Sequence, residues 1–121
     1  MSVLKYQDLI VWQKAMQLVK MVYLIVKKLP KEETYALSDQ IRRAAVSIPS
    51  NIAEGQERNS TKEFIQFLSI AKGSKAELQT QLQICVDIGY LTNTDITEAM
   101  EMSEEVSRMI AALLKKLTTD H

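Results

Sequence analysis

Apolar side chains recur at alternating steps of three and four residues along four segments of the chain, the spacing of one face of an α-helix. The last segment shows it most regularly, at Ile96, Ala99, Ser103, Val106, Ile110, Leu113 and Leu117. Only three Gly and two Pro occur in 121 residues, and turns depend on these residues. The sequence therefore predicts an all-α chain, with residues 1–121 forming one antiparallel up-down-up-down four-helix bundle.

Capping residues set the expected helix boundaries at about 8–28, 32–54, 61–88 and 94–117. Asp8 is suited to cap the first helix, because its carboxylate can accept hydrogen bonds from free backbone N–H groups. Ser60 and Glu63 have the spacing of a capping box at the start of the third. Asn93 or Thr94 is expected to cap the fourth.

Proline and glycine mark the expected interruptions. Pro30 ends the first helix, and Pro49 predicts a kink within the second. Gly55 and Gly89 are expected to end helices in a left-handed conformation. Gly73, in the middle of the third helix, is expected to allow a close approach between helices. The third helix should bury a face that ends in Cys85 and Ile88, with Cys85 acting as a small buried apolar residue.

The first helix carries two adjacent apolar seams, where one would bury it in a bundle. One seam runs through Leu9, Trp12, Met16, Val19, Tyr23 and Val26. The other runs through Ala15, Leu18, Val22, Ile25 and Leu29. The helix is either buried deeply in a monomer or covered by another subunit. We expect the second seam to form an oligomer interface, because a bundle of this size has little core to spare.

The formal net charge is zero, so the chain is not a polycation that binds nucleic acid through overall charge. Residues 1–30 nevertheless carry five Lys against Asp8, and residues 91–121 carry six acids against three bases. These segments either attract each other or form ordinary solvated faces. In an oligomer, the cations of successive subunits would form a basic zone that contacts nucleic acid: Lys14, Lys20, Lys27, Lys28, Arg42 and Arg43.

The sequence offers no complete catalytic or metal-binding constellation, and no cofactor is expected. His121 is the only His, and neither a Glu-x-x-His pair nor a Gly-rich phosphate loop or Cys-x-x-Cys motif occurs. The first residues do not have the pattern of a secretory signal, and no apolar run is long enough to span a membrane. We therefore expect a cytoplasmic protein that is not an enzyme and has no membrane partner.

Polar residues form a stripe along the second predicted helix, and a shorter one along the third. The first contains Gln40, Arg43, Ser47, Asn51, Glu54 and Arg58, and the second contains Ser74, Glu77 and Gln81. Three interpretations remain open: a hydrogen-bonded network between the two helices, a solvated face, or a surface that contacts a ligand or nucleic acid. If Glu54 or Glu77 is buried, Arg43 is the expected partner.

Several of these residues belong to a recognisable pattern. The run Ser47–Gly55 (SIPSNIAEG), with Asp8-Leu9, Trp12–Ala15 and Gln40–Ala44 before it and Glu63-Phe64, Ile70-Ala71, Gly73-Ser74 and Glu77-Leu78 after it, resembles the signature of the ribosomal RNA intervening-sequence proteins. The resemblance covers about residues 6–117. It implies a small helical subunit that assembles into a ring, a homopentamer, and it marks Asn51, Glu54, Gly55, Gly73, Ser74 and Glu77 as family-defining.

The same family is similar to the accessory protein of diversity-generating retroelements, a positively charged pentameric barrel that binds nucleic acid and a reverse transcriptase. We therefore expect a self-assembling scaffold or adaptor whose partner is RNA, DNA or a nucleic-acid-processing protein. The alternative is a ligand-binding or catalytic bundle with a polar pocket between the second and third helices, built from Arg43, Glu54 and Glu77.

Overall fold

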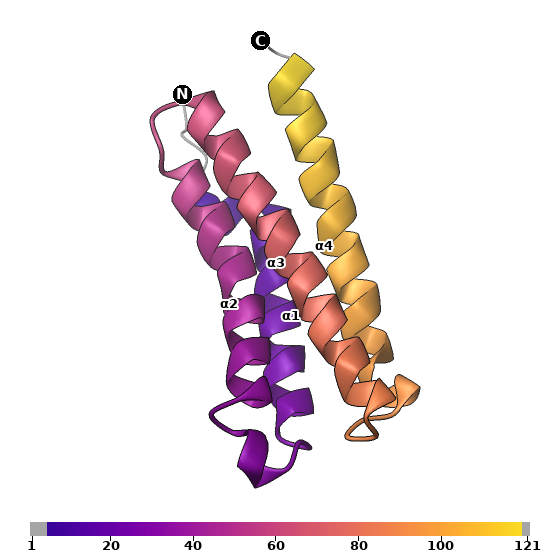
Figure 1. Ribbon diagram of the computed structural model, residues 1–121. Helices are drawn as coiled ribbons and strands as arrows, with labels where there is room; N and C mark the ends of the chain where they lie inside the picture. Colours follow the sequence, from indigo (N-terminus) through magenta and orange to yellow (C-terminus); the bar gives the residue numbers. More distant parts are fainter. Residues whose placement is uncertain (1–4, 120–121) are drawn as a thin grey trace.

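The computed structural model describes residues 5–119, which form four α-helices and two short 3-10 turns and contain no strand. The helices are α1 (Ile10–Val26), α2 (Leu37–Gln56), α3 (Thr61–Asp87) and α4 (Asn93–Thr119). Figure 1 shows them side by side along one common direction, with each connection at the opposite end from the one before. His121 lies outside the described residues.

Helix α1 is shorter than the sequence predicted, because its expected cap belongs to a separate turn. Tyr6–Asp8 form a 3-10 turn, and Leu9 precedes the helix without a side-chain cap. The prediction that Asp8 caps α1 is therefore wrong: its carboxylate instead accepts from the backbone N–H of Lys5 at 3.3 Å. At the other end, α1 stops at Val26, ahead of Pro30.

Helix α2 begins at Leu37, because the residues expected to form its first turn make a separate 3-10 turn at Lys31–Glu33. The Glu33 carboxylate accepts from the Leu37 backbone N–H at 3.3 Å and from the Tyr90 hydroxyl at 2.9 Å. These bonds connect the start of α2 to the α3–α4 connection. Helix α2 continues on both sides of Pro49, which is buried within it.

The starts of α3 and α4 are both capped by hydroxyl side chains, and the capping residue is the predicted one in α3 only. The Ser60 hydroxyl accepts from the Glu63 N–H at 3.2 Å, so the predicted cap of α3 is confirmed. The cap of α4 lies one residue earlier than expected: Thr92 Oγ1 accepts from the Asp95 N–H at 3.2 Å, and Asp95 accepts from the Thr92 N–H at 2.8 Å. Between the two helices Gly89 has a φ of 88°, which confirms its role as a left-handed stop.

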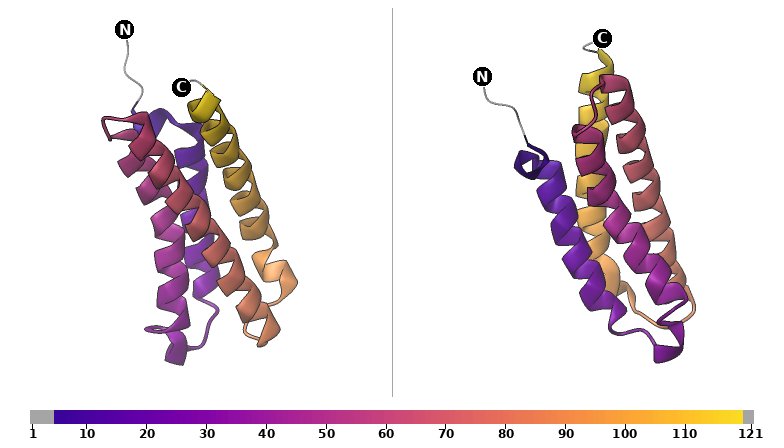
Figure 2. Two further views of the ribbon diagram at one scale, coloured as in Figure 1. Left: turned by 45° about the horizontal axis from the view of Figure 1, so that its top comes forward. Right: turned by 90° about the vertical axis from the view of Figure 1, so that its left-hand side faces the viewer.

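The core lies along the axis enclosed by the four helices. Helix α2 packs most extensively against α3, while α1 lies between α2 and α4, and α3 also contacts α4 (Figure 2). The predicted seam of α4 is buried from Ile96 to Ile110, and Cys85 is buried as expected. Ile88 was predicted to be in the core but is 55% exposed, because two successive steps of three residues turn this position away from the α3 core face.

Candidate functional site

The polar stripe between α2 and α3 forms a small hydrogen-bonded cluster. The hydroxyl groups of Ser47 and Ser74 lie 2.7 Å apart, and each comes from a different helix. Asn51 Nδ2 donates to the Ser47 hydroxyl at 2.9 Å and to the Ser47 carbonyl at 2.7 Å. Ser74 is 9% exposed, so this contact lies at the edge of the core. The cluster joins the two helices at one position along their length.

The charged residues of the same stripe do not converge. Arg43 points to solvent and pairs within α2 with Asp39, where Nε and Oδ2 are 3.0 Å apart. Glu54 is exposed and pairs with Arg58 at 3.4 Å. Glu77 is exposed on α3, and it has no ion pair among residues 5–119. The pairing with Arg43 was expected only for a buried Glu54 or Glu77, and both side chains are exposed, so that condition is not met.

Neither Gly55 nor Gly73 has the role that the sequence predicted for it. Gly55 is buried within α2, and a β-carbon added there would lie 2.7 Å from Phe67 Cβ and 2.9 Å from Phe64 Cδ1. It is thus the residue that allows α2 and α3 to approach closely, and not a left-handed stop. A β-carbon added to Gly73 would meet no atom within 4 Å. The prediction of a close approach at Gly73 within the chain is therefore wrong.

Four of the six cations predicted to form a basic zone pair with acids of the same chain. Lys14 pairs with Glu105 at 3.4 Å, and Lys28 pairs with Asp95 at 2.8 Å, so the basic first helix holds the acidic last one. Arg42 and Arg43 both pair with Asp39, at 4.0 and 3.0 Å. Lys20 of α1 and Lys27, the residue that follows the helix, are exposed and have no acidic partner among the described residues.

The pairing of Lys28 changes the acidity of its partner. The pKa of Asp95 is lowered to about 2, first by the Lys28 ammonium and then by the Thr92 N–H at the start of α4. Elsewhere on α4 the pKa of Glu104 is lowered by the Gln79 amide, whose Nε2 donates to Glu104 Oε2 at 2.7 Å, and by Lys75. Helix α4 is therefore held to α1 and α3 through its carboxylates.

The two apolar seams of α1 have exchanged the roles predicted for them: the expected interface seam faces the core, and the expected core seam is partly exposed. The seam assigned to an oligomer interface, comprising Ala15, Leu18, Val22, Ile25 and Leu29, is buried in the core of the chain itself. That prediction is wrong, because small and branched side chains at these positions fit between the other helices. The other seam faces outward in part: Met16 is 38% exposed and Tyr23 is 44% exposed.

This outward seam lines an apolar groove between α1 and α2, which we call the α1–α2 groove. One hollow of about 320 Å³ is lined by Tyr6, Trp12, Met16, Val19, Val46, Pro49, Ser50 and Ala53. A second, more polar hollow of about 420 Å³ lies at the end of the groove where α1 connects to α2, lined by Tyr23, Val26, Lys27, Leu29, Lys31, Thr34, Ser38 and Arg42. Sequence reasoning missed the α2 side of this groove. The sequence feature that could have indicated a groove is the pair of large aromatic residues in the first seam, Trp12 and Tyr23, because such residues are common at protein interfaces.

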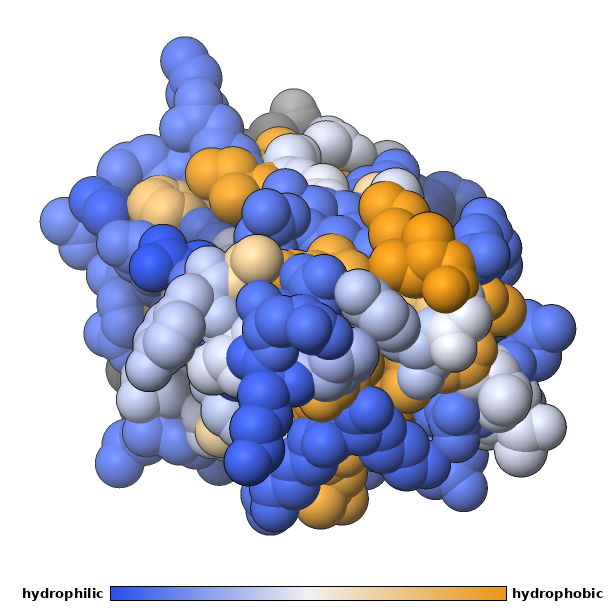
Figure 3. All heavy atoms as spheres, turned by 60° about the horizontal axis from the view of Figure 1, so that its bottom comes forward, coloured by the Kyte–Doolittle hydropathy of each residue, from blue (hydrophilic) through white to orange (hydrophobic). Residues whose placement is uncertain are grey.

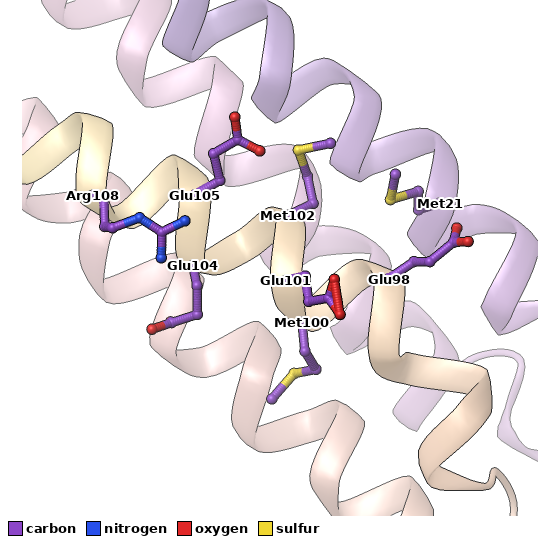
Figure 4. Close-up of a pocket in the computed structure, with 8 residues that line it drawn as sticks. All are labelled: Met21, Glu98, Met100, Glu101, Met102, Glu104, Glu105 and Arg108. Atoms are coloured by element: carbon purple, nitrogen blue, oxygen red, sulfur yellow. The ribbon is translucent and has the colours of Figure 1, made fainter.

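A further hollow of about 610 Å³ lies over α4 and contains mostly acidic and Met side chains. Figure 4 shows Glu98, Glu101, Glu104 and Glu105 pointing in different directions, with Met21 contributed by α1. Carboxylates that diverge in this way do not form a catalytic pair. Within residues 5–119, no group of three or more His, Cys, Asp or Glu side chains is arranged to hold a metal ion. No helix in this part of the chain is long and apolar enough to cross a membrane.

The comparisons with known proteins agree with this architecture. Residues 7–112 match the model of the family described as 23S rRNA-intervening sequence protein. The chain belongs to this family. A solved structure from Bacteroides thetaiotaomicron, described as a protein with unknown function from the S23 ribosomal protein family, is 25% identical, with a TM-score of 0.81. The match covers 88% of this chain and 99% of that chain. No curated protein matches.

In this member of the 23S rRNA-intervening sequence protein family, the signature residues divide into two groups. Gly55, Ser74 and Asn51 act inside the chain, where they set the spacing and contact of α2 and α3. Gly73, Glu77 and Glu54 are exposed: a β-carbon added to Gly73 would meet no atom within 4 Å, Glu77 has no ion pair among residues 5–119, and Glu54 pairs only with the nearby Arg58. The signature therefore describes both a helix pair and an outward-facing surface.

Proposed function

We propose that this chain is a non-enzymatic subunit whose up-down-up-down bundles assemble into a ring-like homopentamer that acts as a cytoplasmic scaffold or adaptor. The α1–α2 groove is the observation that supports assembly. It exposes Met16, Tyr23 and Val46 by 38%, 44% and 40%, next to Trp12 and Pro49. Contiguous apolar and aromatic surface of this kind is typical of sites that bind another protein.

Sedimentation velocity and mass measurement at micromolar concentration test the assembly. The wild-type chain should sediment as a defined oligomer, and the double variant Met16→Gln, Val46→Gln should shift toward monomer. Ile10→Gln is the matched control, because Ile10 is 54% exposed on α1 but does not line the groove. A wild-type chain that remains monomeric would rule out the proposal.

The adaptor part of the proposal concerns a nucleic acid or nucleoprotein partner. It is supported by Lys20 and Lys27, which are exposed two helical turns apart and have no acidic partner in the described chain. In a ring, these cations would repeat from subunit to subunit and attract a polyanion, although each subunit is neutral.

Titration with a structured RNA at several salt concentrations tests this contact. Binding should weaken as salt rises, and Lys20→Gln, Lys27→Gln should weaken it further and flatten the salt dependence, because fewer counterions are released. The matched control is Lys62→Gln, Lys72→Gln, two exposed cations of α3 without an ion pair in the described residues. Both variants are titrated at a protein concentration at which sedimentation shows them to have the mass of the wild-type assembly. Binding that is absent at low salt would exclude this surface.

The alternative of a ligand-binding or catalytic pocket has less support. It requires Arg43, Glu54 and Glu77 to converge, whereas Arg43 pairs with Asp39, Glu54 pairs with Arg58, and Glu77 lies exposed on α3. A heat-stability screen against small anions and metabolites would favour this alternative if a ligand raised Tm and Arg43→Gln abolished the effect.

A further inference from the structure

The outer face of α3 carries a row of exposed residues, which we call the α3 ridge: Ile70, Gly73, Glu77, Ile84 and, just past the end of the helix, Ile88. Ile70, Glu77 and Ile84 occupy the same position in successive heptads, and Gly73 and Ile88 lie one turn from members of this row. The three isoleucines are 51%, 41% and 55% exposed. Figure 3 shows that apolar patches also interrupt the polar surface at the end of the bundle that carries the α1–α2 and α3–α4 connections.

The shape of the α3 ridge suits contact with another protein. Gly73 lies between Ile70 and Glu77, and there is open space where its side chain would be. A glycine in an exposed helix lowers helix stability by about 1 kcal/mol relative to Ala. However, because glycine has no side chain, the backbone of another helix can approach closely at this position. The ridge thus has a low point at Gly73, with the protruding side chains of Ile70 and Glu77 on either side.

We propose that the α3 ridge of one copy binds in the α1–α2 groove of a second copy of this chain. The inference rests on the proposed self-assembly and names the two surfaces that carry it. The ridge supplies Ile70 and Ile84, and the groove supplies Met16, Tyr23 and Val46. These are the exposed aliphatic and aromatic groups that an interface core requires.

The charges on the two surfaces favour binding of a ridge in a groove over contact between two ridges or between two grooves. If two ridges met antiparallel about a two-fold axis, the Glu77 carboxylates would approach each other near the centre of the contact. If two grooves met, Lys27, Lys31 and Arg42, which line the second hollow, would face the same cations of the other copy. A ridge in a groove instead brings Glu77 toward Lys20 or Lys27, none of which has an ion pair within the described chain.

The contact is therefore head-to-tail, with a different surface on each side. An open chain of head-to-tail contacts leaves a free groove on one terminal subunit and a free ridge on the other until a ring closes. One Glu77 neutralises only one of the two lysines, so the rim of each contact keeps a positive charge that remains available to a polyanion. The ridge also accounts for Gly73 and Glu77, which have no comparable role inside one chain.

Two complementary variants test this arrangement. Ile70→Gln, Ile84→Gln removes the ridge, and Met16→Gln, Val46→Gln removes the groove. All four side chains are at least 38% exposed, so the circular dichroism spectrum should stay that of wild type. Loss of two buried apolar groups should weaken the contact about 100-fold. Each variant alone should be monomeric, whereas their equimolar mixture should form a 1:1 dimer and nothing larger, because only one intact ridge and one intact groove can meet.

The possible outcomes separate this inference from the assembly itself. If the wild type assembles and the ridge variant assembles equally well, the α3 ridge is not the partner surface, while self-assembly stands. If both variants are monomeric and their mixture is too, the contact is not head-to-tail between these surfaces. A monomeric wild type overturns the assembly as a whole.

Charge reversal gives an independent measurement on the same two surfaces. Glu77→Lys should weaken assembly, and Lys20→Glu, Lys27→Glu introduced into the same chain should restore it. Lys62→Glu, Lys72→Glu is the matched control and should not restore it. Restoration by the control pair, or no effect of Glu77→Lys, would overturn the charge pairing.

Discussion

Gly55 of α2 lies so close to Phe67 of α3 that a β-carbon on Gly55 would stand 2.7 Å from Phe67 Cβ. The side chain of Phe67 is also covered by Arg58, whose guanidinium carbon lies 4.8 Å from the ring centroid. Phe67 therefore has little room to move away. This contact sets the spacing between the most extensively packed pair of helices in the bundle.

Gly55→Ala should lower the free energy of unfolding by about 1–3 kcal/mol, because the added methyl group overpacks the contact with Phe67. Gly73→Ala should raise it by about 0.5–1 kcal/mol, because Ala is the better helix former and the added carbon meets no atom. Urea denaturation of both variants, in the Met16→Gln, Val46→Gln background to exclude assembly, measures the difference. Equal effects of the two substitutions would contradict the assigned roles.

The hydroxyl pair of Ser47 and Ser74 should contribute measurably to the α2–α3 contact. Ser74→Ala and Ser47→Ala should each lower the free energy of unfolding by about 1 kcal/mol, the usual value for a partly buried hydrogen bond. The double variant should lose less than the sum, because the second substitution finds the bond already broken. Ser69→Ala is the control: its hydroxyl is exposed and bonds only to the Ile65 carbonyl of its own helix. Strict additivity would show that the two hydroxyls act independently.

Much of the fold could be predicted because the relevant signals are local. Ile96 to Ile110 of α4 are buried as their spacing indicated, and Ser60 and Gly89 mark helix ends through their own conformational preferences. The predictions that Asp8 caps α1 and that Ile88 is buried were wrong. Both residues lie at helix ends, where neighbouring turns decide whether a residue still follows the helical period.

The candidate surfaces were harder to predict, because they depend on contacts between distant segments. Both seams of α1 have helical spacing, and the sequence alone does not indicate which one faces α2 to α4. Lys14 and Lys28 could not be excluded from a basic zone without the positions of Glu105 and Asp95, far along the chain. Gly55 and Gly73 look alike in sequence, and only the approach of Phe67 distinguishes them.

Asp95 should make the bundle sensitive to acid. Its pKa is lowered from 3.8 to about 2 in the folded chain, so the ionised carboxylate favours folding above its ordinary pKa. This contribution is lost as pH falls from the ordinary value toward about 2. Asp95→Asn should therefore reduce stability at neutral pH and make it less dependent on pH between about pH 5 and pH 2.

Carbon-detected NMR titration of the Asp95 carboxyl group checks the cause. Lys28→Met should raise the pKa of Asp95 toward its ordinary value, since the Lys28 ammonium makes the largest contribution to the shift. Lys27→Met is the matched control, because Lys27 has no ion pair in the described chain and should leave the Asp95 pKa unchanged. An equal shift in both variants would indicate general charge effects in place of the specific pair.

Gln81 of α3 provides the last prediction, because it is 8% exposed and its Oε1 has no hydrogen-bond partner in the described chain. Burying an unpaired acceptor costs about 1–3 kcal/mol, so Gln81→Met, which keeps a similar shape, should raise the free energy of unfolding by about 1 kcal/mol. Gln79→Met is the contrasting control: its Nε2 donates to Ser103 and Glu104, both at 2.7 Å, so this substitution should destabilise the chain and raise the pKa of Glu104. Destabilisation by Gln81→Met as large as that by Gln79→Met would show that the Gln81 carbonyl is bonded in solution.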